Sequence, residues 1–437
     1  VGDGIIMKLN CEPCTNAVER QQRREWDGVR DAVRVGSVRR RSVLQGEDLS
    51  KLKLTGATIF PLRIPFVAGF SHSSSARLHS DAIVVRVTAD DGTAGYGEGL
   101  PRPYVTGETT ESCIGHMVSH LWPAVSRVDF ADLVPGPDPI QTLEPVEASL
   151  PVVESDGVIA WNAARAAFEL AVVDVLARRQ GLSMAEILPS KRSAVVYSGV
   201  ISTGPIDAAV RLAERCVELG VPAIKIKIAG DDAFGRVAAV REVVGPAVSL
   251  RVDANGAYDV DGAIDILNQL AALSVECAEQ PIPRGAPQEL ATVQAASPIS
   301  VMADESLVTV EDGRALIAAR ACEYFNLRLS KCGGIRRTLE IAGEAQRAGV
   351  RLQVGCQVGE VAILSAAGRH LAAYLDDVAY VEGSYGSMLL SEDIGEESIG
   401  FGSGGMGEVL RGPGLGVRVV DERLSRYAES VTRLGAD

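Results

Sequence analysis

Lysine is scarce in this chain of 437 residues, and arginine supplies most of its basic side chains. The lysines are Lys8, Lys51, Lys53, Lys191, Lys225, Lys227 and Lys331. Arginine keeps its proton in proteins, whereas lysine can release it. Lysines at apolar strand positions therefore point to chemistry that arginine cannot perform. The run Ile224 to Ile228 holds two of them, in strict alternation with isoleucine.

The chain also lacks an excess of positive charge, long apolar runs and a paired cysteine framework. Its net charge of −14 argues against general binding to nucleic acid or to an anionic membrane. No run of about eighteen apolar residues and no signal-peptide pattern occur, so we expect a cytoplasmic protein that does not enter a membrane. The scattered cysteines are expected to be reduced, and Cys277, Cys322, Cys332 and Cys356 to be buried.

Changes in composition divide the chain into four predicted parts. Residues 1–50 form a polar, arginine-rich extension, which we expect to be partly disordered. Residues 51–190 predict an α+β unit, residues 191–385 a barrel, and residues 386–437 a C-terminal segment. Within the α+β unit the patterns predict strands at 54–65, 82–89 and 93–98, helices at 109–124 and 157–179, and long loops at 66–80 and 97–107. Long loops on a compact unit are typical of lids.

Apolar, β-branched runs recur regularly in residues 191–385. They are Ala194 to Tyr197, Ile224 to Ile228, Ser249 to Val252, Val275 to Ala278, Ile299 to Ala303, Tyr324 to Leu329, Arg351 to Val354 and Val378 to Val381. Each has a polar residue in it or just after it: Ser198, Lys225, Asp253, Glu279, Asp304, Lys331, Gln357 and Ser384. These are 25 to 28 residues apart, with helical stretches between them. The spacing predicts an α/β fold of the (β/α)8 type, with the polar residues at the strand ends that carry barrel active sites.

Three of these polar residues are acidic and end consecutive strands. Asp253, Glu279 and Asp304 should therefore converge, and unpaired they would repel each other. A hard divalent cation turns such a group into an oxygen cage; separate ion pairs with helix arginines are the alternative. Because no His or Cys is among the candidates, we expect Mg²⁺, with Mn²⁺ as a possible substitute. Asn255 lies on the same face as Asp253 and is expected either to support the metal ligands or to face the bound ligand. Glu305, beside Asp304, is expected either to accept a hydrogen bond from a lysine or to be a charge at a helix N-terminus.

Lysines flank the three acids along the chain. In an eight-stranded ring, strands two and six lie opposite each other, so Lys227 and Lys331 should face a bound ligand from opposite sides. This arrangement suits removal of a proton α to a carboxylate, with return of a proton from the other side. Repulsion between Lys225 and Lys227 should lower the pKa of at least one of them.

The chain resembles the enolase superfamily, in the muconate lactonizing enzyme subgroup that includes dipeptide epimerases and o-succinylbenzoate synthases. The resemblance runs from about Leu52 to Arg418 and rests on Lys225-x-Lys227, Asp253-Ala-Asn255, Glu279-Gln-Pro281, Ala303-Asp304-Glu305-Ser306 and Lys331-Cys-Gly-Gly334. It implies a (β/α)7β barrel with an α+β capping domain that the C-terminal segment completes, and a homo-oligomer. It also implies that Asp253, Glu279 and Asp304 bind Mg²⁺, and that Lys227 and Lys331 are the acid/base pair, which Lys225 assists.

The resemblance further implies that two cap loops, around His72 and around Arg102 and Tyr104, close over the substrate. Dipeptide epimerases carry an Asp-x-Asp pair after strand eight, but this chain has Glu382-Gly-Ser384, which argues against a dipeptide substrate. Glu382 is expected to pair either with a cationic substrate group or with a loop arginine. The candidate substrate contacts are His72, Arg102, Tyr104, Ser198, Gln357, Glu360, Glu382 and Ser384.

We therefore expect a metal-dependent racemase or epimerase of a small carboxylate, most simply an amino-acid derivative. Cycloisomerisation of the muconate type and syn-dehydration begin or end at the same enolate and stay open. An aldolase that forms a Schiff base at Lys331 is a different class, as is a barrel that only binds ligands. The run Gly402-Ser-Gly404-Gly-Met-Gly407 fits a dinucleotide motif but lacks its strand and helix, so we expect no organic cofactor.

Overall fold

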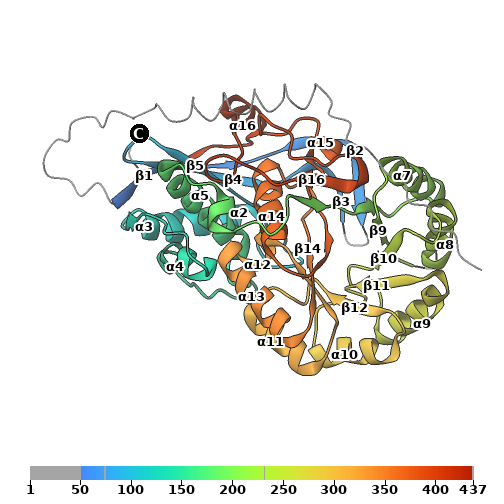
Figure 1. Ribbon diagram of the computed structural model, residues 1–437. Helices are drawn as coiled ribbons and strands as arrows, with labels where there is room; N and C mark the ends of the chain where they lie inside the picture. Colours follow the sequence, from blue (N-terminus) through green and yellow to red (C-terminus); the bar gives the residue numbers. More distant parts are fainter. Residues whose placement is uncertain (1–50, 73–74, 231, 436–437) are drawn as a thin grey trace, which may run out of the picture. The chain divides into compact units, whose positions relative to one another are not determined.

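The computed structural model describes residues 51–72, 75–230 and 232–435, without the side chains of residues 68–76 (Figure 1). The predicted extension 1–50 lies outside the described residues. An antiparallel sheet forms the cap, with β17, β1, β4 and β5 in this order and β6 paired to β1. Its strands are β1 (Lys51–Pro61), β4 (Ile83–Ala89), β5 (Ala94–Gly99), β6 (Asp129–Ala131) and β17 (Thr432–Gly435). Because Gly435 pairs with Gly56, the C-terminal segment completes the cap sheet.

A β-hairpin replaces the loop that was predicted at residues 66–80. Its strands are β2 (Ile64–His72) and β3 (Ser75–Ser80), and Pro65 pairs with His79. The loop prediction rested on the Ser and Gly content. Backbone pairing instead satisfies the N–H and C=O groups of this segment, largely independently of side chains.

Between β5 and the barrel strands the chain forms a series of helices, of which α5 packs on the cap sheet. They are α2 (Thr110–His116), the π-helical turn η1 (Met117–Leu121), α3 (Trp122–Val125), α4 (Pro139–Ser149), α5 (Asn162–Gln180) and α6 (Met184–Ile187). Helix α5 begins later than predicted, because Ala160 and Trp161 have positive φ angles and cannot continue a helix. It ends as predicted at Gly181, which is left-handed with φ 70°.

Strand β5 packs directly on helix α5 because glycine occupies every second position of the strand. A Cβ on Gly97 would lie 1.9 Å from the carbonyl oxygen of Ala167, and one on Gly99 would lie 2.2 Å from that of Ala163. Only glycine on the strand, facing alanine on the helix, permits this approach. The alternate residue Glu98 points to the other side of β5, toward the barrel.

Eight parallel strands form the barrel sheet, in the order β15 to β8 without interruption. They are β8 (Gly199–Ile201), β9 (Ala223–Lys227), β10 (Ser249–Asp253), β11 (Val275–Glu279), β12 (Ser300–Ala303), β13 (Tyr324–Leu327), β14 (Arg351–Val354) and β15 (Val378–Val381). The sheet curls until its edges meet, where the Ser198 N–H donates to Val381 O at 2.9 Å. The fold is thus the predicted α/β barrel with an α+β cap.

The first barrel strand differs from the prediction. The run from Ala194 forms β7 (Ala194–Val196), which pairs antiparallel with β16 (Met406–Glu408) outside the barrel sheet. Val196 is 42% exposed, so β7 lacks the two buried faces of a barrel strand. Strand β8 takes the first barrel position instead.

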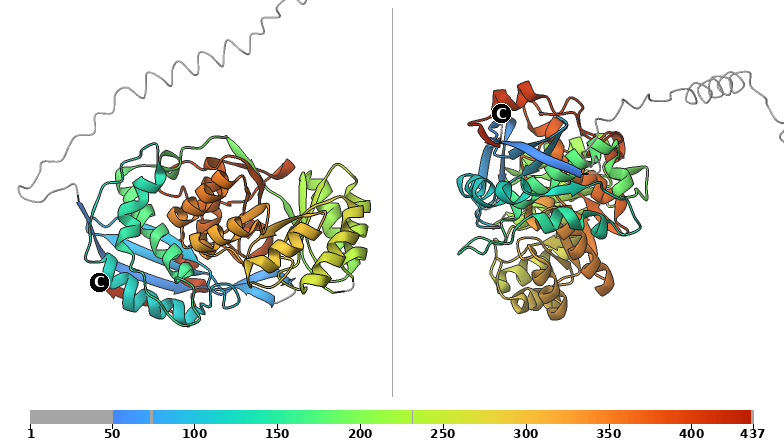
Figure 2. Two further views of the ribbon diagram at one scale, coloured as in Figure 1. Left: turned by 90° about the horizontal axis from the view of Figure 1, so that it is seen from below. Right: turned by 90° about the vertical axis from the view of Figure 1, so that its left-hand side faces the viewer.

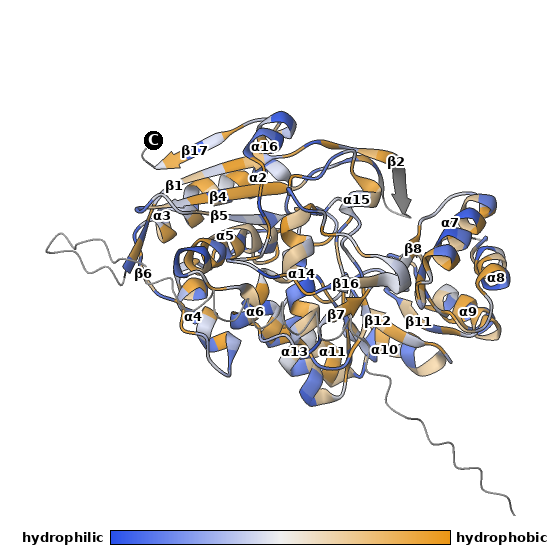
Figure 3. Ribbon diagram, turned by 45° about the horizontal axis from the view of Figure 1, so that its top comes forward, coloured by the Kyte–Doolittle hydropathy of each residue, from blue (hydrophilic) through white to orange (hydrophobic). Residues whose placement is uncertain are grey.

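Helices surround the barrel strands, as Figures 1 and 2 show. They are α7 (Ile206–Leu219), α8 (Ala233–Val244), α9 (Val260–Leu270) with the 3-10 turn η2 (Ala271–Leu273), α10 (Pro287–Ala296), α11 (Val310–Ala319), α12 (Leu329–Cys332), α13 (Ile335–Ala348) and α14 (Ala362–Tyr374). Figure 3 shows α7, α8 and α9 in part blue and in part orange, as expected for helices with one face on the strands.

The C-terminal segment links the barrel back to the cap. It contains α15 (Gly386–Leu389), the 3-10 turn η3 (Ser403–Gly405), β16, α16 (Asp421–Tyr427) and β17. The glycine-rich run at residues 402–407 forms η3 and β16 and not a strand–helix turn. Of the four cysteines expected to be buried, Cys356 is partly exposed and the others are buried. Within the described ranges, no helix is both long and apolar enough to cross a membrane.

Candidate active site

The carboxyl ends of β9, β10 and β11 place three functional side chains in one row. Asp253 pairs in register with Lys227 on one side and with Glu279 on the other. Asp304 directly follows β12, and Lys331 lies in α12, which follows β13. Asp253, Glu279 and Asp304 are each 0% exposed. The three acids thus end consecutive strands, with one lysine beyond each end of their row.

Lys227 is held by two oxygens on the neighbouring strand. Its Nζ donates to Asp253 Oδ2 at 2.9 Å and to Asn255 Oδ1 at 2.6 Å. Asn255 has a positive φ of 46°, which turns its side chain back toward β9. Its Nδ2 donates in turn to Glu305 Oε1 at 3.1 Å. Asn255 and Glu305 therefore form a chain that fixes the ammonium group of Lys227.

Lys331 is held by a different set of acceptors. Its Nζ donates to Asp304 O at 2.7 Å, to Asp304 Oδ1 at 2.9 Å and to Asn326 O at 2.8 Å. All three N–H groups of the ammonium therefore have acceptors, and the side chain is fully buried. Lys331 must release one of these hydrogen bonds before it can exchange a proton with a substrate.

Lys225 lies deeper in the barrel than Lys227, among carboxylates. Its Nζ is 2.7 Å from Glu382 Oε2, 3.1 Å from Glu279 Oε2 and 3.3 Å from Asp253 Oδ2. Burial alone lowers the pKa of Lys225, but these three acids outweigh it and raise the pKa above its ordinary value. The expectation that repulsion lowers a lysine pKa is therefore wrong for Lys225, which stays protonated.

Glu382 is shared between Lys225 and an arginine on strand β10. Its Oε1 lies 2.5 Å from Arg251 Nη2, and Arg251 Nη1 donates to Ser198 Oγ at 3.1 Å. The Arg251 guanidinium also stacks on the ring of Tyr380, 4.3 Å from its centroid. These contacts cross the line where β15 and β8 meet, so a buried ion-pair network closes the barrel. The arginine partner of Glu382 lies on a strand and not on a loop.

Glu279 is the most heavily hydrogen-bonded of the three acids. Besides Lys225, it accepts from Asn326 Nδ2 at 2.9 Å, from Gln353 Nε2 at 3.1 Å and from Arg328 Nη2 at 2.9 Å. Arg328 Nη2 also lies 2.5 Å from Asp304 Oδ2. Glu279 is thus anchored by strands β13 and β14, and Arg328 bridges it to Asp304.

The basic groups keep two of the acids charged. Burial raises the pKa of Asp253, but Lys227 and Lys225 outweigh it and leave the pKa below its ordinary value. Burial likewise raises the pKa of Asp304, but Arg328 and Lys331 lower it by more, so the pKa lies below its ordinary value. Glu305 differs, because burial and the charges of Asp304 and Asp253 raise its pKa to about 8.

The three acids fit a hard divalent cation in their chemistry. They offer only buried carboxylate oxygens, and Asp304 Oδ2 has no hydrogen-bond donor within the described part of the chain. However, no three His, Cys, Asp or Glu side chains of the described residues lie close enough together to coordinate a metal as they stand. Arg328 lies between two of the acids, 2.9 Å from Glu279 Oε1 and 2.5 Å from Asp304 Oδ2.

The structure places the candidate substrate contacts at different depths. Ser198 and Glu382 lie inside the network around Arg251, as described above. The Ser384 hydroxyl bonds to Tyr197 Oη at 3.0 Å and to Arg369 Nη2 at 3.1 Å, so these groups hold it.

Arg102, Gln357 and Glu360 lie where the cap meets the loop after β14. Arg102 is 1% exposed and donates to Asp81 Oδ1 at 2.9 Å and to Val358 O at 2.7 Å, which joins the cap to that loop. Glu360 Oε1 accepts from the Gln357 N–H at 2.7 Å. Burial raises the pKa of Glu360 to about 7, against the opposing effects of that N–H and of Arg328 and Arg102.

Two further candidates are on the cap loops. Tyr104 is 44% exposed on the cap loop after β5. The backbone of His72 ends strand β2, whereas its side chain is outside the described residues.

The sequence reasoning missed Arg251, Arg328, Asn326 and Gln353. The signal was present, because each is a polar residue within or directly after an otherwise apolar strand. Arg251 stands two residues before Asp253 and therefore faces the same side of β10. Arg328 stands three residues before Lys331, directly after β13.

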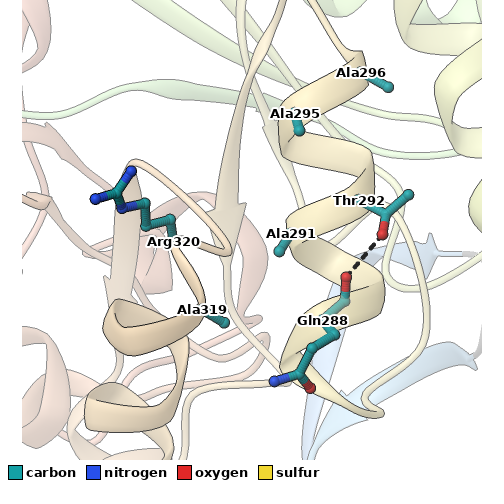
Figure 4. A pocket seen from close by; sticks show the side chains of 7 residues that line it. All are labelled: Gln288, Ala291, Thr292, Ala295, Ala296, Ala319 and Arg320. Carbon is teal, nitrogen blue, oxygen red and sulfur yellow. Dashed lines mark hydrogen bonds between the residues drawn. The ribbon is translucent and has the colours of Figure 1, made fainter.

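A hollow between helices α10 and α11 lies apart from this site (Figure 4). It is lined by Gln288, Ala291, Thr292, Ala295, Ala296, Ala319 and Arg320. In the close-up the Thr292 hydroxyl turns back to the carbonyl of Gln288. These residues belong to the outer helices and include no acid, so the hollow is not the candidate active site.

Comparison with known proteins defines the class of this chain. The family model described as enolase C-terminal domain-like matches residues 208–423. The L-Lys-D/L-Arg epimerase of Methylococcus capsulatus is 32% identical over 361 residues, which cover 82% of this chain and 96% of that protein. The chain therefore belongs to the enolase superfamily, and its relatives define it as an isomerase of that superfamily.

Solved structures agree with this assignment. The N-succinyl Arg/Lys racemase of Bacillus cereus superimposes with a TM-score of 0.78 at 25% identity, over 87% of this chain and 100% of that one. The dipeptide epimerase of Cytophaga hutchinsonii, solved with Mg and the dipeptide D-Ala-L-Val, has a TM-score of 0.76 at 25% identity, over 87% of this chain and 99% of that one. Racemases and epimerases of amino-acid derivatives are thus among the proteins similar to this chain.

Proposed function

We propose that this protein racemises or epimerises an N-acylated α-amino acid with a free carboxylate. The observation that carries the proposal is the pair Lys227 and Lys331, which lie at the two ends of the row of buried acids. One lysine removes the proton α to the carboxylate and the other delivers a proton to the opposite face. Cycloisomerisation and dehydration do not require a base on each side, so the pair favours inversion.

The acids Asp253, Glu279 and Asp304 are proposed to hold Mg²⁺, for which Mn²⁺ can substitute. When bound, the cation supplies positive charge that stabilises the negative charge developing on the substrate carboxylate. The side chains of this protein orient the two lysines that transfer the proton. Asn255 and Glu305 orient the Lys227 ammonium, and Asp304 and Asn326 orient that of Lys331.

The relatives and the charges in the barrel support this substrate class. The relatives include an L-Lys-D/L-Arg epimerase and a dipeptide epimerase solved with D-Ala-L-Val, a dipeptide in which the second residue is N-acylated. An N-succinyl amino acid shares this feature. Both oxygens of Glu382 are used by Lys225 and Arg251, so Glu382 neutralises the barrel interior and does not bind a substrate cation. A homo-oligomeric state and a cytoplasmic location stay predictions.

Exchange of the α-proton in deuterated water tests the proposal. Dipeptides, N-acyl amino acids, betaines and muconates would be incubated with the protein and Mg²⁺ and followed by NMR and by chiral chromatography. We expect deuterium incorporation together with inversion for dipeptides or N-acyl amino acids. Conversion of muconates without exchange of any amino-acid derivative would replace the proposal with a cycloisomerase.

A further inference from the structure

The guanidinium of Arg328 joins two acids of the proposed metal site. Arg328 directly follows β13, and its Nη2 lies 2.9 Å from Glu279 Oε1 and 2.5 Å from Asp304 Oδ2. These two acids end the neighbouring strands β11 and β12. A divalent cation that both of them coordinate competes with this guanidinium for the same carboxylates.

Charge balance shows why the competition matters. Five basic side chains meet four acids here, namely Lys225, Lys227, Arg251, Arg328 and Lys331 with Asp253, Glu279, Asp304 and Glu382. Glu305 lies beside them, but its pKa of about 8 leaves it mostly protonated at neutral pH. A divalent cation therefore adds positive charge to a buried cluster that has no deficit of positive charge, and a buried excess charge is costly. A lysine can relieve the excess by releasing a proton, but an arginine cannot. Arg328 can relieve it only by moving away.

Arg328 is also held less firmly than Lys331. Its side chain is 10% exposed, compared with 0% for both Lys331 and Arg251. Within the described residues its Nε has no hydrogen-bond partner, and its contact with Asp304 Oδ2 is close but not aligned as a hydrogen bond. Lys331, by contrast, uses all three donors. Charge attraction and one hydrogen bond to Glu279 hold Arg328 in place.

We propose that Arg328 is an internal counter-ion that competes with the divalent cation for Glu279 and Asp304. In the metal-free protein it neutralises the two carboxylates and keeps them from repelling each other. When the cation binds, the guanidinium swings out of the carboxylate row toward solvent. This inference rests on the proposed metal site and adds to it a residue that weakens cation binding.

Calorimetric titration of Mg²⁺ into the wild-type protein and into R328Q tests the inference. Because the competing charge is gone, we expect R328Q to bind Mg²⁺ about tenfold more tightly. We also expect metal-free R328Q to melt at a lower temperature than the metal-free wild type, since Glu279 and Asp304 then repel each other. Mg²⁺ should therefore raise the melting temperature of R328Q by more than that of the wild type.

R284Q is the matched control. Arg284 Nη1 donates to the carbonyl oxygen of Glu305 at 3.1 Å and its Nη2 to Asp312 at 2.8 Å, so it lies near the site without bonding to the metal-binding acids. We expect R284Q to bind Mg²⁺ as the wild type does.

The outcomes separate this inference from the proposed metal site. If the wild type binds Mg²⁺ and folded R328Q binds it equally or more weakly, Arg328 is not a competitor, and the metal site stands. If the wild type binds no Mg²⁺, both proposals fail. If R328Q does not fold, a wild-type crystal structure with Mg²⁺ decides the question. Arg328 should then be beyond hydrogen-bonding reach of Glu279, and an intact bond between them refutes the competition.

Discussion

Two groups of buried carboxylates in this protein differ in their partners and not in their burial. In the barrel, Asp253, Glu279 and Asp304 meet lysine and arginine side chains. Within the cap and at its joint with the barrel, a second group accepts hydrogen bonds mainly from backbone N–H groups. Its members are Glu98, which binds Val361 and Leu364, Glu108, which binds Ala163 and Ala164, Glu169, which binds Ile335 and Arg336, and Asp174, which binds Tyr96 and Leu415 and also accepts from Arg178 Nε at 2.7 Å.

The partners decide what each group can do. A backbone N–H is a fixed dipole that neither moves nor exchanges its proton with a substrate, so the second group locks helix ends and strands in place. Burial dominates there and raises the pKa of all four acids. A lysine or arginine carries a full charge on a flexible side chain, and a lysine can exchange its proton. The exposed fraction of an acid therefore does not identify it as catalytic, whereas the groups that donate hydrogen bonds to it do.

Removal of the barrel lysines is expected to have the largest effect on activity. K227A and K331A should each lower racemisation by about 10³-fold or more, because each removes the proton donor or acceptor on one face. Each variant should still exchange the α-proton of the enantiomer that faces its remaining lysine. Exchange measured by NMR on each pure enantiomer checks this result.

A surface lysine provides the control for these variants. Lys191 is paired with Asp376 on the exterior, with 42% of its side chain exposed. K191A should keep wild-type racemisation and exchange. Racemisation that survives in K331A would show that a single lysine serves both faces, which contradicts the proposed division of roles.

Removal of the metal ion is expected to affect the barrel acids but not the second group of carboxylates. After thorough chelation, α-proton exchange should fall to background, and added Mg²⁺ should restore it. The joint carboxylates bind only protein groups, so the protein should remain folded, as judged by circular dichroism. Exchange that continues undiminished in the chelated protein would remove the proposed metal-dependent mechanism.

Glu169 is expected to make the stability of the protein depend on pH. Burial raises the pKa of Glu169 to about 7, against opposing hydrogen bonds from the N–H groups of Arg336 and Ile335. A carboxyl whose pKa is raised on folding stabilises the protein fully below its unfolded pKa, and that contribution is lost as the pH rises through the folded value. From the ordinary 4.5 to about 7, the wild type should lose roughly 3 kcal/mol that E169Q does not lose.

Urea unfolding of wild type and E169Q at about pH 5 and about pH 7.5 measures this difference. The free energy of unfolding of the wild type should fall relative to that of E169Q as the pH rises. Parallel changes in the two proteins would show that Glu169 does not titrate in this range.

The barrel acids could be predicted from sequence, whereas the joint acids could not. Asp253, Glu279 and Asp304 interrupt apolar strands at a constant spacing, so one-dimensional periodicity reveals them. Glu169 lies in a helix rich in alanine, and its partner Ile335 is 166 residues away along the chain. Glu98 reaches Val361 across 263 residues. A carboxylate whose partner is a distant backbone amide leaves no pattern in its own neighbourhood.

The same reasoning explains how much of the fold was predictable. Seven of the eight barrel strands follow from their buried runs, and the cap hairpin of β4 and β5 follows from its turn at Asp90 and Asp91. The run at Ala194 has the same composition but pairs with β16, which a local pattern cannot show. Arg328 was not predicted for a related reason, since its role depends on two acids of other strands.

Substitution of Glu108 is expected to have the smallest effect, and this effect is on stability and not on activity, in contrast to the lysines. Its two carboxylate oxygens accept from the N–H groups of Ala163 and Ala164 at 2.9 and 3.0 Å, in the first turn of α5. In E108Q one oxygen is replaced by an amide NH₂ that cannot accept, and the negative charge at the helix N-terminus is lost. We expect the free energy of unfolding to fall by about 1–2 kcal/mol, which urea titration measures.

The activity of E108Q decides whether the two groups are independent. Because Glu108 contacts backbone amides of α5 and none of the barrel acids or lysines, α-proton exchange per folded molecule should equal that of the wild type. K227A should lose exchange at the Lys227 face even per folded molecule, and its free energy of unfolding should also fall, because Asp253 then lacks a buried ion-pair partner. If E108Q instead slows exchange in proportion to its loss of stability, the cap joint transmits strain to the lysines. The distinction between backbone N–H partners and basic side-chain partners would then no longer separate structural from catalytic acids in this protein.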